Sequence, residues 1–555
     1  MAVVQDVMDR LAQLASARSG YEAIWDQVDA VAATHVAPGG YGRSGVGITN
    51  PTPNAAIRSK KLYDSTGINA VDRLASGIEA LVIPQSEFWH GLGITDFKRS
   101  KRTDPELLWL KDQRDLLFEI RYDADSGWVN SSQSAIRSCI SHGAGFYYVE
   151  EGFTKHALIS YQYIPLRECY ISTDAKGTVT CFYRYYELTA EQALGEFGNR
   201  TPAKIREAAE NPSRKDQRSQ YIHAIHPRGD YGRTNDIQGS QFQSVHISVQ
   251  EKAVCKERGY YEFPIMDFRW LPEGTSGWAE GPVMKCLSDI QSLQVMGRNE
   301  LLAGEQSVRP PLLVANAGVM NRPSAAPGAI NLGGVNAQGQ RMIEPLFNGQ
   351  RLDFATMVIE AKRNMVKDSM YLNLFALLVQ NPQMSATEAM IRANEKGELL
   401  GPAGSRLQQT LSRMIDRELG ILTRKGLYAP TSAYRVPQTL QGKTISPQMT
   451  GPLDRLRRAK EGEGILRVLE AIAPIAQAEP EVVDNIDGDE TVRELRDIFG
   501  APVSILRDPK VRDQKRQARQ QAQQLAQNAA AAKDMAAAGK QGTDALAGMK
   551  TAGFL

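Results

Sequence analysis

The chain has 555 residues, of which 42% are hydrophobic and 23% are charged, and its formal net charge is +2. Because a single hydrophobic core stops growing at about 250–300 residues, this length indicates several domains. The composition is typical of a globular protein and argues against a disordered chain, while the small net charge argues against a protein that coats nucleic acid through a global basic field. We find no apolar run long enough to span a bilayer and no signal-peptide pattern after Met1, so we expect synthesis in a cytoplasm and no membrane partner.

The first 280 residues are predicted to combine amphipathic helices with antiparallel strands. Apolar residues recur at helical spacing in residues 3–33, as one or two helices, and in residues 64–82. In residues 128–150 a helix gives way to an aromatic run. In residues 161–270, short β-branched and aromatic runs alternate with Asp, Gly and Pro turns, which indicates an α+β region rich in antiparallel strands.

Two long helices are predicted to bracket one small, loop-rich insert. Residues 282–308 lack an internal proline and end at Arg309-Pro310-Pro311, and residues 352–378 form a second helix of similar length. Between them, short strands are expected at 312–315 and 329–332, within loops rich in Gly, Asn and Pro.

A third long helix is predicted for residues 386–424. Ser385 and Glu388 have the spacing of a capping box, in which each side chain accepts from the other residue's backbone N–H. Gly401 and Pro402 lie near the middle of this helix, where the missing N–H and the clashing ring of proline are expected to kink or break it.

The remainder of the chain is predicted to be helical in shorter pieces, at residues 453–473, ended by Pro474, and at 491–498. The Ala/Gln-rich stretch at 510–538 favours helix but has few large apolar side chains to bury. It is either a helix ordered by neighbours in an oligomer or a mobile tail.

The sharpest enzymatic motif is Gly442-Lys443-Thr444, which resembles the end of a phosphate-binding loop. Such a loop needs a glycine five residues earlier, where this chain has Pro437, and it needs a strand before it and a helix after it. We therefore predict that the match is a chance one and that the chain is not an ATPase.

No other pattern indicates catalysis or a metal. In the predicted strand, His223 and His226 point to opposite faces, and the acidic run 487–490 lacks the spacing of a calcium loop. The five cysteines form no CxxC pair, which favours buried thiols over disulfides or zinc. We predict no catalytic residue, no metal site and no cofactor.

One face of the second long helix is polar. Glu360, Arg363 and Lys367 lie along it, while Val358, Met365 and Leu372 lie towards the opposite side. The polar face could line a water-filled channel. It could equally be an ordinary solvated face on which Glu360 pairs with Arg363.

Several local strings, in this order along most of the chain, resemble the head-to-tail connector, or portal, family of short-tailed bacteriophages. The strings are Leu62-Tyr63-Asp64-Ser65-Thr66, Arg73-Leu74-Ala75-Ser76-Gly77, Ile164-Pro165-Leu166-Arg167-Glu168, Phe263-Pro264, Arg269-Trp270, Gly281-Pro282, Asp289-Ile290, Ala386-Thr387-Glu388, Leu400-Gly401-Pro402 and Arg406-Leu407. Their order, together with the arrangement of long helix, small insert and long helix, carries the resemblance; the region beyond Gly426 contributes least.

The resemblance implies a mixed α+β fold, mainly α, with the parts of a portal protein. The implied parts are a wing (1–280), a first stem helix (281–308), a clip (309–350), a second stem helix (351–378), a tunnel loop (379–385), a long kinked wing helix (386–430), a crown (431–509) and a C-terminal barrel helix or mobile tail (510–555).

By the same resemblance, the chain is a structural subunit of a homododecameric ring at the portal vertex of the virion, assembled in the host bacterial cytoplasm. The implied partners are the other copies in the ring, double-stranded DNA that passes through the channel without sequence specificity, the major capsid and scaffolding proteins, the large terminase subunit during packaging, and the tail adaptor and internal core proteins. The candidate site residues are Gln380, Asn381 and Gln383 in the tunnel loop, Glu360, Arg363 and Lys367 on the stem, and Arg309, Arg322 and Arg341 at a clip interface. The alternatives are another virion structural protein, such as a tail adaptor or internal core protein, and, with less support, a DNA-packaging ATPase.

Overall fold

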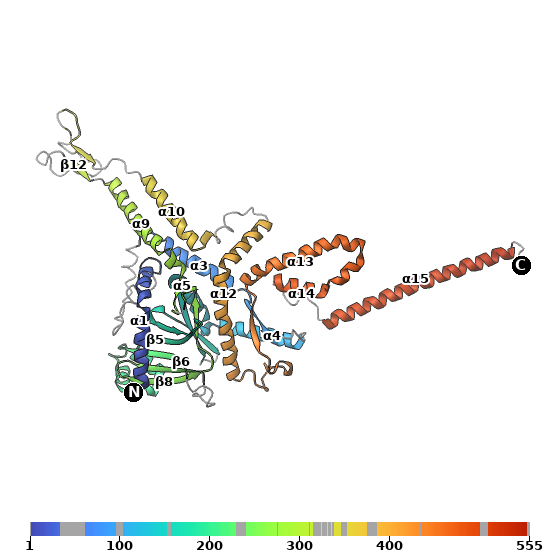
Figure 1. The fold of residues 1–555 in the computed structure, drawn as a ribbon, viewed down its shortest axis with the longest axis horizontal. Coiled ribbons are helices and arrows are strands. Elements are labelled where there is room, and N and C mark those ends of the chain that lie inside the picture. The colour runs from blue at the N-terminus through green and yellow to red at the C-terminus, as the bar shows by residue number, and fades with distance from the viewer. Residues whose placement is uncertain are drawn as a thin grey trace. The chain divides into compact units, whose positions relative to one another are not determined.

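The computed structural model describes most of the chain. The described residues are 2–33, 62–95, 104–152, 157–228, 240–274, 276–309, 352–373, 386–432, 434–499 and 509–551, with scattered positions between 311 and 345. They form two compact units, residues 1–457 and 458–555. The fold is mixed α+β with helices predominating, as predicted (Figure 1).

The N-terminal segment is one helix, α1 (Ala2–Val31). The buried Arg18 guanidinium pairs with Glu22 and donates from Nη1 to the carbonyl of Cys169 at 2.5 Å. Trp25 Nε1 donates to the carbonyl of His142 at 3.1 Å. These contacts attach the helix to the end of α5 (Trp128–His142) and to the beginning of β4 (Cys169–Thr173).

The predicted α+β region contains two antiparallel sheets. The larger has the strand order β4-β5-β6-β7-β8 and the smaller has the order β3-β2-β9. The strands are β2 (Ala144–Glu151), β3 (Ile159–Ile164), β4 (Cys169–Thr173), β5 (Val179–Thr189), β6 (Arg218–Pro227), β7 (Phe242–Ser248), β8 (Ala253–Tyr260) and β9 (Ile265–Arg269), and the helices α6 (Ala190–Phe197) and α7 (Ala203–Glu210) follow β5. The prediction of an α+β region rich in antiparallel strands is confirmed.

The main core of the first unit lies largely among four helices and the smaller sheet, and buried residues of other helices, such as Ile290 and Val366, belong to it as well. The four helices are α3 (Thr66–Val82), α4 (Asp104–Tyr122), α5 (Trp128–His142) and α12 (Ala386–Arg424). Strand β1 (His90–Ile94) pairs antiparallel with β14 (Ile445–Met449), which brings the chain near the end of this unit back to the segment between α3 and α4. The division between the two compact units follows Arg457, and the crown boundary expected at residue 431 stays a prediction.

A fully buried ion pair joins four elements within this core. Arg121 of α4 donates from Nη2 to Glu418 of α12 at 2.6 Å, and Tyr161 of β3 donates to the same carboxylate at 2.5 Å. Arg121 Nη1 also lies 3.1 Å from Nε2 of His90 in β1. Burial and the nearby Arg121 charge hold the pKa of His90 well below its usual value, so the ring stays neutral and can accept this bond.

The predicted arrangement of long helix, insert and long helix is present as a helical hairpin, with β12 at its far end (Figure 1). Its helices are the short α8 (Pro282–Lys285), then α9 (Leu287–Val308) and α10 (Leu352–Ser369). The first helix is thus interrupted at Cys286. The second ends at Ser369, and Tyr371 has a left-handed backbone with φ of 57°. Leu372 and Asn373 are helical again, and residues 374–378 of the predicted helix lie outside the described residues.

The insert between these helices contains an antiparallel pair, β12 (Leu312–Val314) with β13 (Ile343–Pro345). The strand expected at 312–315 is confirmed. Of the strand expected at 329–332, only Ile330 is described, and it is not in a strand. The partner of β12 was not predicted, because a three-residue strand carries too little pattern to be recognised.

Helix α12 continues through Pro402, so the helix is not broken there. The kink expected at Gly401 and Pro402 stays a prediction. Pro402 is exposed, whereas Gly401 is buried. A solvent-facing proline can be kept within a helix because water can satisfy the backbone groups that it leaves unpaired.

The second unit consists of the rest of α13 (Pro452–Ala478), α14 (Gly488–Phe499) and α15 (Pro509–Thr551). Helix α13 runs past Pro474, so the prediction that this proline ends the helix is wrong. The acidic run is not a metal loop: Asp487 caps α14, and Asp489 pairs with Arg516 of α15 at 2.7 Å. The Ala/Gln-rich stretch lies within the helix α15, and whether neighbours in an oligomer order it stays a prediction.

Candidate functional site at the helical hairpin

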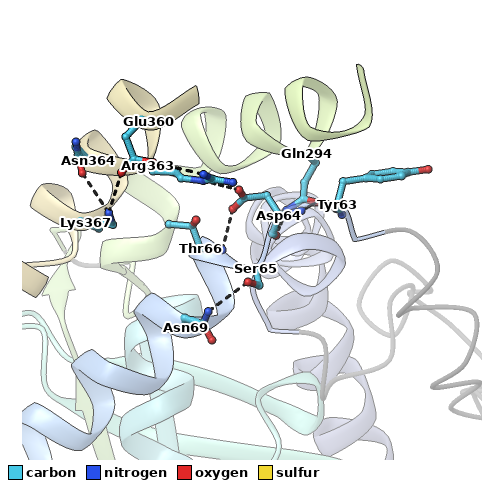
Figure 2. A network of polar contacts seen from close by, with 10 residues as sticks. All are labelled: Tyr63, Asp64, Ser65, Thr66, Asn69, Gln294, Glu360, Arg363, Asn364 and Lys367. Carbon is cyan, nitrogen blue, oxygen red and sulfur yellow. Dashed lines mark hydrogen bonds and ion pairs between the residues drawn. The ribbon is translucent and has the colours of Figure 1, made fainter. Parts of the chain in front are cut away.

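The three polar residues predicted on the second long helix lie together on one face of α10 (Figure 2). Glu360 accepts from Arg363 Nη1 at 3.4 Å and from Lys367 Nζ at 3.4 Å. The pairing of Glu360 with Arg363 is thus present, and all three side chains remain partly exposed. A channel-facing role for this face stays a prediction.

Arg363 has a second partner that sequence reasoning missed. Its Nε donates to Oδ2 of Asp64 at 3.0 Å, and the Asp64 side chain is almost fully buried (Figure 2). Oδ1 of the same carboxylate accepts from the backbone N–H of Thr66 at 2.8 Å, in the first turn of α3. Asp64 therefore joins α10 to the beginning of α3.

Gln294 holds the same segment to the other helix of the hairpin. Its Oε1 accepts from the backbone N–H groups of Tyr63 and Asp64, at 2.8 and 3.1 Å, and its Nε2 donates to the carbonyl of Asp64 at 2.6 Å. We call Asp64, Gln294 and Arg363 the hairpin clamp, because they attach both α9 and α10 to one point of the chain. Lys362 adds a direct link between the two helices through Asp289, at 2.6 Å.

The clamp is electrostatically favourable at neutral pH. Burial alone would raise the pKa of Asp64, but the hydrogen bonds from Thr66 and Arg363 outweigh it and hold this pKa below its usual value. The Asp64 hydrogen bond in turn raises the pKa of Arg363. Both groups are therefore charged wherever the protein is folded near neutral pH.

Replacing Asp64 with asparagine should destabilise the first unit by about 1–3 kcal/mol at pH 7, because a buried hydrogen bond to a charged group is lost. The folded pKa of Asp64 lies below the unfolded one, so its contribution is present above about pH 4 and is lost as pH falls through the folded pKa. When urea unfolding is measured from pH 7 down to about pH 2, the free energies of unfolding of wild type and Asp64→Asn should converge. The control Asp72→Asn removes an exposed carboxylate that pairs with Arg137, and should show little difference at any pH. If the two free energies of unfolding differ by the same amount at every pH, the claim that ionised Asp64 stabilises the fold is refuted.

The other predicted site residues are placed only in part. Gln380, Asn381, Gln383 and Arg322 lie outside the described residues. Arg309 and Arg341 are exposed, the first just after α9 and the second in an isolated bridge with Val335, so both sit in or beside the insert. The kink pair, Gly401 and Pro402, lies within α12.

The phosphate-loop motif has a different local structure. Gly442 has φ of 78°, Lys443 pairs with Glu106 at 3.2 Å, and the strand β14 follows where a phosphate loop would have a helix. The lysine is thus used as a structural ion-pair partner.

The histidines pair in a way that the sequence did not indicate. His223 stacks on His246 of the neighbouring strand, with ring centroids 3.8 Å apart, rather than acting with His226. Burial lowers the pKa of His246 to about 3 and holds that of His223 well below its usual value, so both rings are neutral. Among the described residues there is no group of three or more metal-ligating side chains, and the five cysteines are free thiols, four of them buried.

Comparison with known protein families identifies the family of this chain. A family model described as "Bacteriophage head to tail connecting protein" matches residues 4–506. The chain belongs to this family.

Two curated members of similar length support the assignment. The chain is 24% identical over 506 residues to the "Probable portal protein" of Bordetella phage BPP-1, and 24% identical over 511 residues to the "Portal protein" of Salmonella phage epsilon15. Each match covers 90% of this chain and 88% of the relative. A solved structure titled "Virion of native gene transfer agent (GTA) particle" overlaps 83% of this chain and 97% of its own, with 11% identity and a TM-score of 0.35, which is too low to support an argument.

As a head-to-tail connecting protein, the chain is a structural component of a bacteriophage virion and not an enzyme. The predicted family and the absence of an enzymatic role are confirmed. In the part of the chain that the structure describes, no helix is both long and apolar enough to cross a membrane.

Proposed function

We propose that this chain is the portal subunit of a short-tailed bacteriophage. In this role, identical copies close into a ring, a homododecamer, at the portal vertex of the capsid. Double-stranded DNA is packaged and ejected through the ring, and the tail is attached to it. The observation that carries the proposal is the family match over residues 4–506, with relatives named as portal proteins.

The helical hairpin supports a ring because its helices leave apolar side chains uncovered. Val295 and Leu302 of α9 are 60% and 44% exposed, and Met357 and Met365 of α10 are 73% and 51% exposed. In a closed ring each copy offers two different surfaces, one to each neighbour. The α9 face of one copy and the α10 face of the next would cover one another in such a ring.

The other expected parts follow from this role. Residues 1–280 and the helix containing Gly401 and Pro402 would form the wing, and α9 and α10 the stem. Residues 309–350 would form the clip, residues 431–509 the crown, and residues 510–555 a barrel helix or mobile tail. Arg309, Arg322 and Arg341 would contact the large terminase subunit and later the tail adaptor. Gln380, Asn381 and Gln383, and the Glu360 face of α10, would face the DNA. Assembly in the bacterial cytoplasm would involve the capsid, scaffolding and internal core proteins.

Electron microscopy of the purified protein, classified by symmetry, tests the proposal. Rings with an open axial channel are the expected result. A chain that stays monomeric at high concentration would overturn the proposal and favour a tail adaptor or an internal core protein.

A further inference from the structure

A cavity of about 460 Å³ lies between α3 and α10, beside the hairpin clamp. Figure 2 shows four of the side chains that line it, which come from these two helices. The polar residues of the lining are Thr66, Asn69, Arg73, Asn364, Lys367 and Asn373. The cavity is therefore polar on both sides, and the clamp fixes the distance between the helices that form it.

The lining carries two cations and no carboxylate. Lys367 donates to Glu360 outside the cavity at 3.4 Å and to Asn364 at 3.2 Å, both longer than a typical hydrogen bond from a charged group. Arg73 makes no hydrogen bond or ion pair with any residue that the structure describes; the neighbouring Asp72 pairs with Arg137 instead. Such a lining favours an anion.

We infer that this cavity binds a phosphate group of the DNA backbone. The inference rests on the proposed function and adds to it a defined contact, repeated once in every subunit. The guanidinium of Arg73 can offer paired N–H donors to phosphate oxygens, Lys367 supplies a point charge, and the amide and hydroxyl groups can complete the coordination. Because these groups meet only the phosphate, binding does not depend on base sequence.

The position of the cavity favours DNA over a free anion. Lys367 belongs to the polar face of α10 that is proposed to line the channel, and Asn373 lies six residues before the proposed tunnel loop at 379–385. Arg73 is exposed, so a polymer can reach it without a conformational change.

The test measures binding of a fluorescent 30-base-pair duplex to the purified full-length protein across a range of salt concentrations. Arg73→Gln should weaken binding roughly tenfold and lower the slope of log K against log salt, which is about 0.9 for each phosphate contacted. Arg73 has no described partner to lose, so the variant should keep the wild-type Tm. Lys367→Gln should act in the same direction. The control Lys204→Gln removes an exposed lysine of α7, and should leave the duplex affinity unchanged.

Electron microscopy of each variant separates the two proposals. If wild type forms rings and binds the duplex but Arg73→Gln binds equally well, the phosphate site is refuted while the portal role stands. If Lys204→Gln loses as much affinity as Arg73→Gln, the effect is one of general charge and the site is also refuted. Displacement of the duplex by inorganic phosphate at low millimolar concentration would identify a free-anion site. Equal displacement by polyglutamate of matched charge would show that the cavity takes carboxylates, and either displacement result would overturn the assignment to DNA.

Discussion

Replacing Arg121 with methionine is expected to lower the free energy of unfolding of the first unit by about 3–5 kcal/mol, because it leaves the carboxylate of Glu418 buried without its cation. Both side chains are fully buried, and their closest approach is 2.6 Å. Tyr161 would still donate to Glu418, but a single neutral donor cannot replace a charge in a site that excludes water. The guanidinium also lies 4.7 Å from the ring centroid of Trp89, so part of the loss is a cation–π contact.

Urea unfolding followed by tryptophan fluorescence measures this effect, since Trp89 and Trp128 lie beside the network. Arg137→Met is the matched control, because Arg137 pairs with Asp72 on the surface and should cost about 0–1 kcal/mol. The double variant Arg121→Met, Glu418→Leu should recover much of the loss, since no unpaired charge remains. A loss for Arg121→Met no larger than that of the control would contradict the structural role of the ion pair.

Replacing Leu302 with aspartate should prevent ring closure. In the proposed ring, this side chain of α9 lies against the next copy, and the change would bury an unpaired carboxylate at every interface. Because a ring contains as many such interfaces as copies, a cost of a few kcal/mol at each should move the protein to monomers or short open chains. Light scattering coupled to size-exclusion chromatography, with electron microscopy, gives the measurement.

Val254→Asp is the control for this variant. Val254 lies in β8, away from the hairpin, and is 41% exposed against 44% for Leu302. Val254→Asp should therefore change the solubility of the protein as much as Leu302→Asp does, but it should not affect ring assembly. Normal rings from Leu302→Asp would show that α9 does not contact a neighbour, and the exposed apolar face of the hairpin would then need another partner.

Much of the fold could be predicted from local pattern. The period of apolar residues located α1 and α3, the stretch without proline located α9, and the capping-box spacing located the beginning of α12. The β-branched and aromatic runs located the region of strands. Helix ends were less predictable. Pro474 lies inside α13 although proline was expected to end it, and the helix predicted to run to 378 is interrupted after Ser369, where Tyr371 has a left-handed backbone. At such points packing and the backbone conformation of single residues outweigh propensity.

The candidate site was predictable only within one helix. Glu360, Arg363 and Lys367 share a face because residues three, four and seven apart on a helix lie close together, and the sequence alone shows this. That Arg363 reaches Asp64, 299 positions away, could not be read from any local pattern. Charge pairing between distant segments leaves no periodic signal.

The sequence by itself determined the family, the class of fold and the absence of a complete phosphate loop, because each depends on residue types in order along the chain. Only the tertiary structure decided that β14 pairs with β1, that Arg121 is buried against Glu418, and that the hairpin clamp joins α3 to both helices of the hairpin. These contacts join segments that are hundreds of residues apart. They form because burying the apolar faces of the helices and sheets brings those segments together, and polar groups enclosed in that way must find partners.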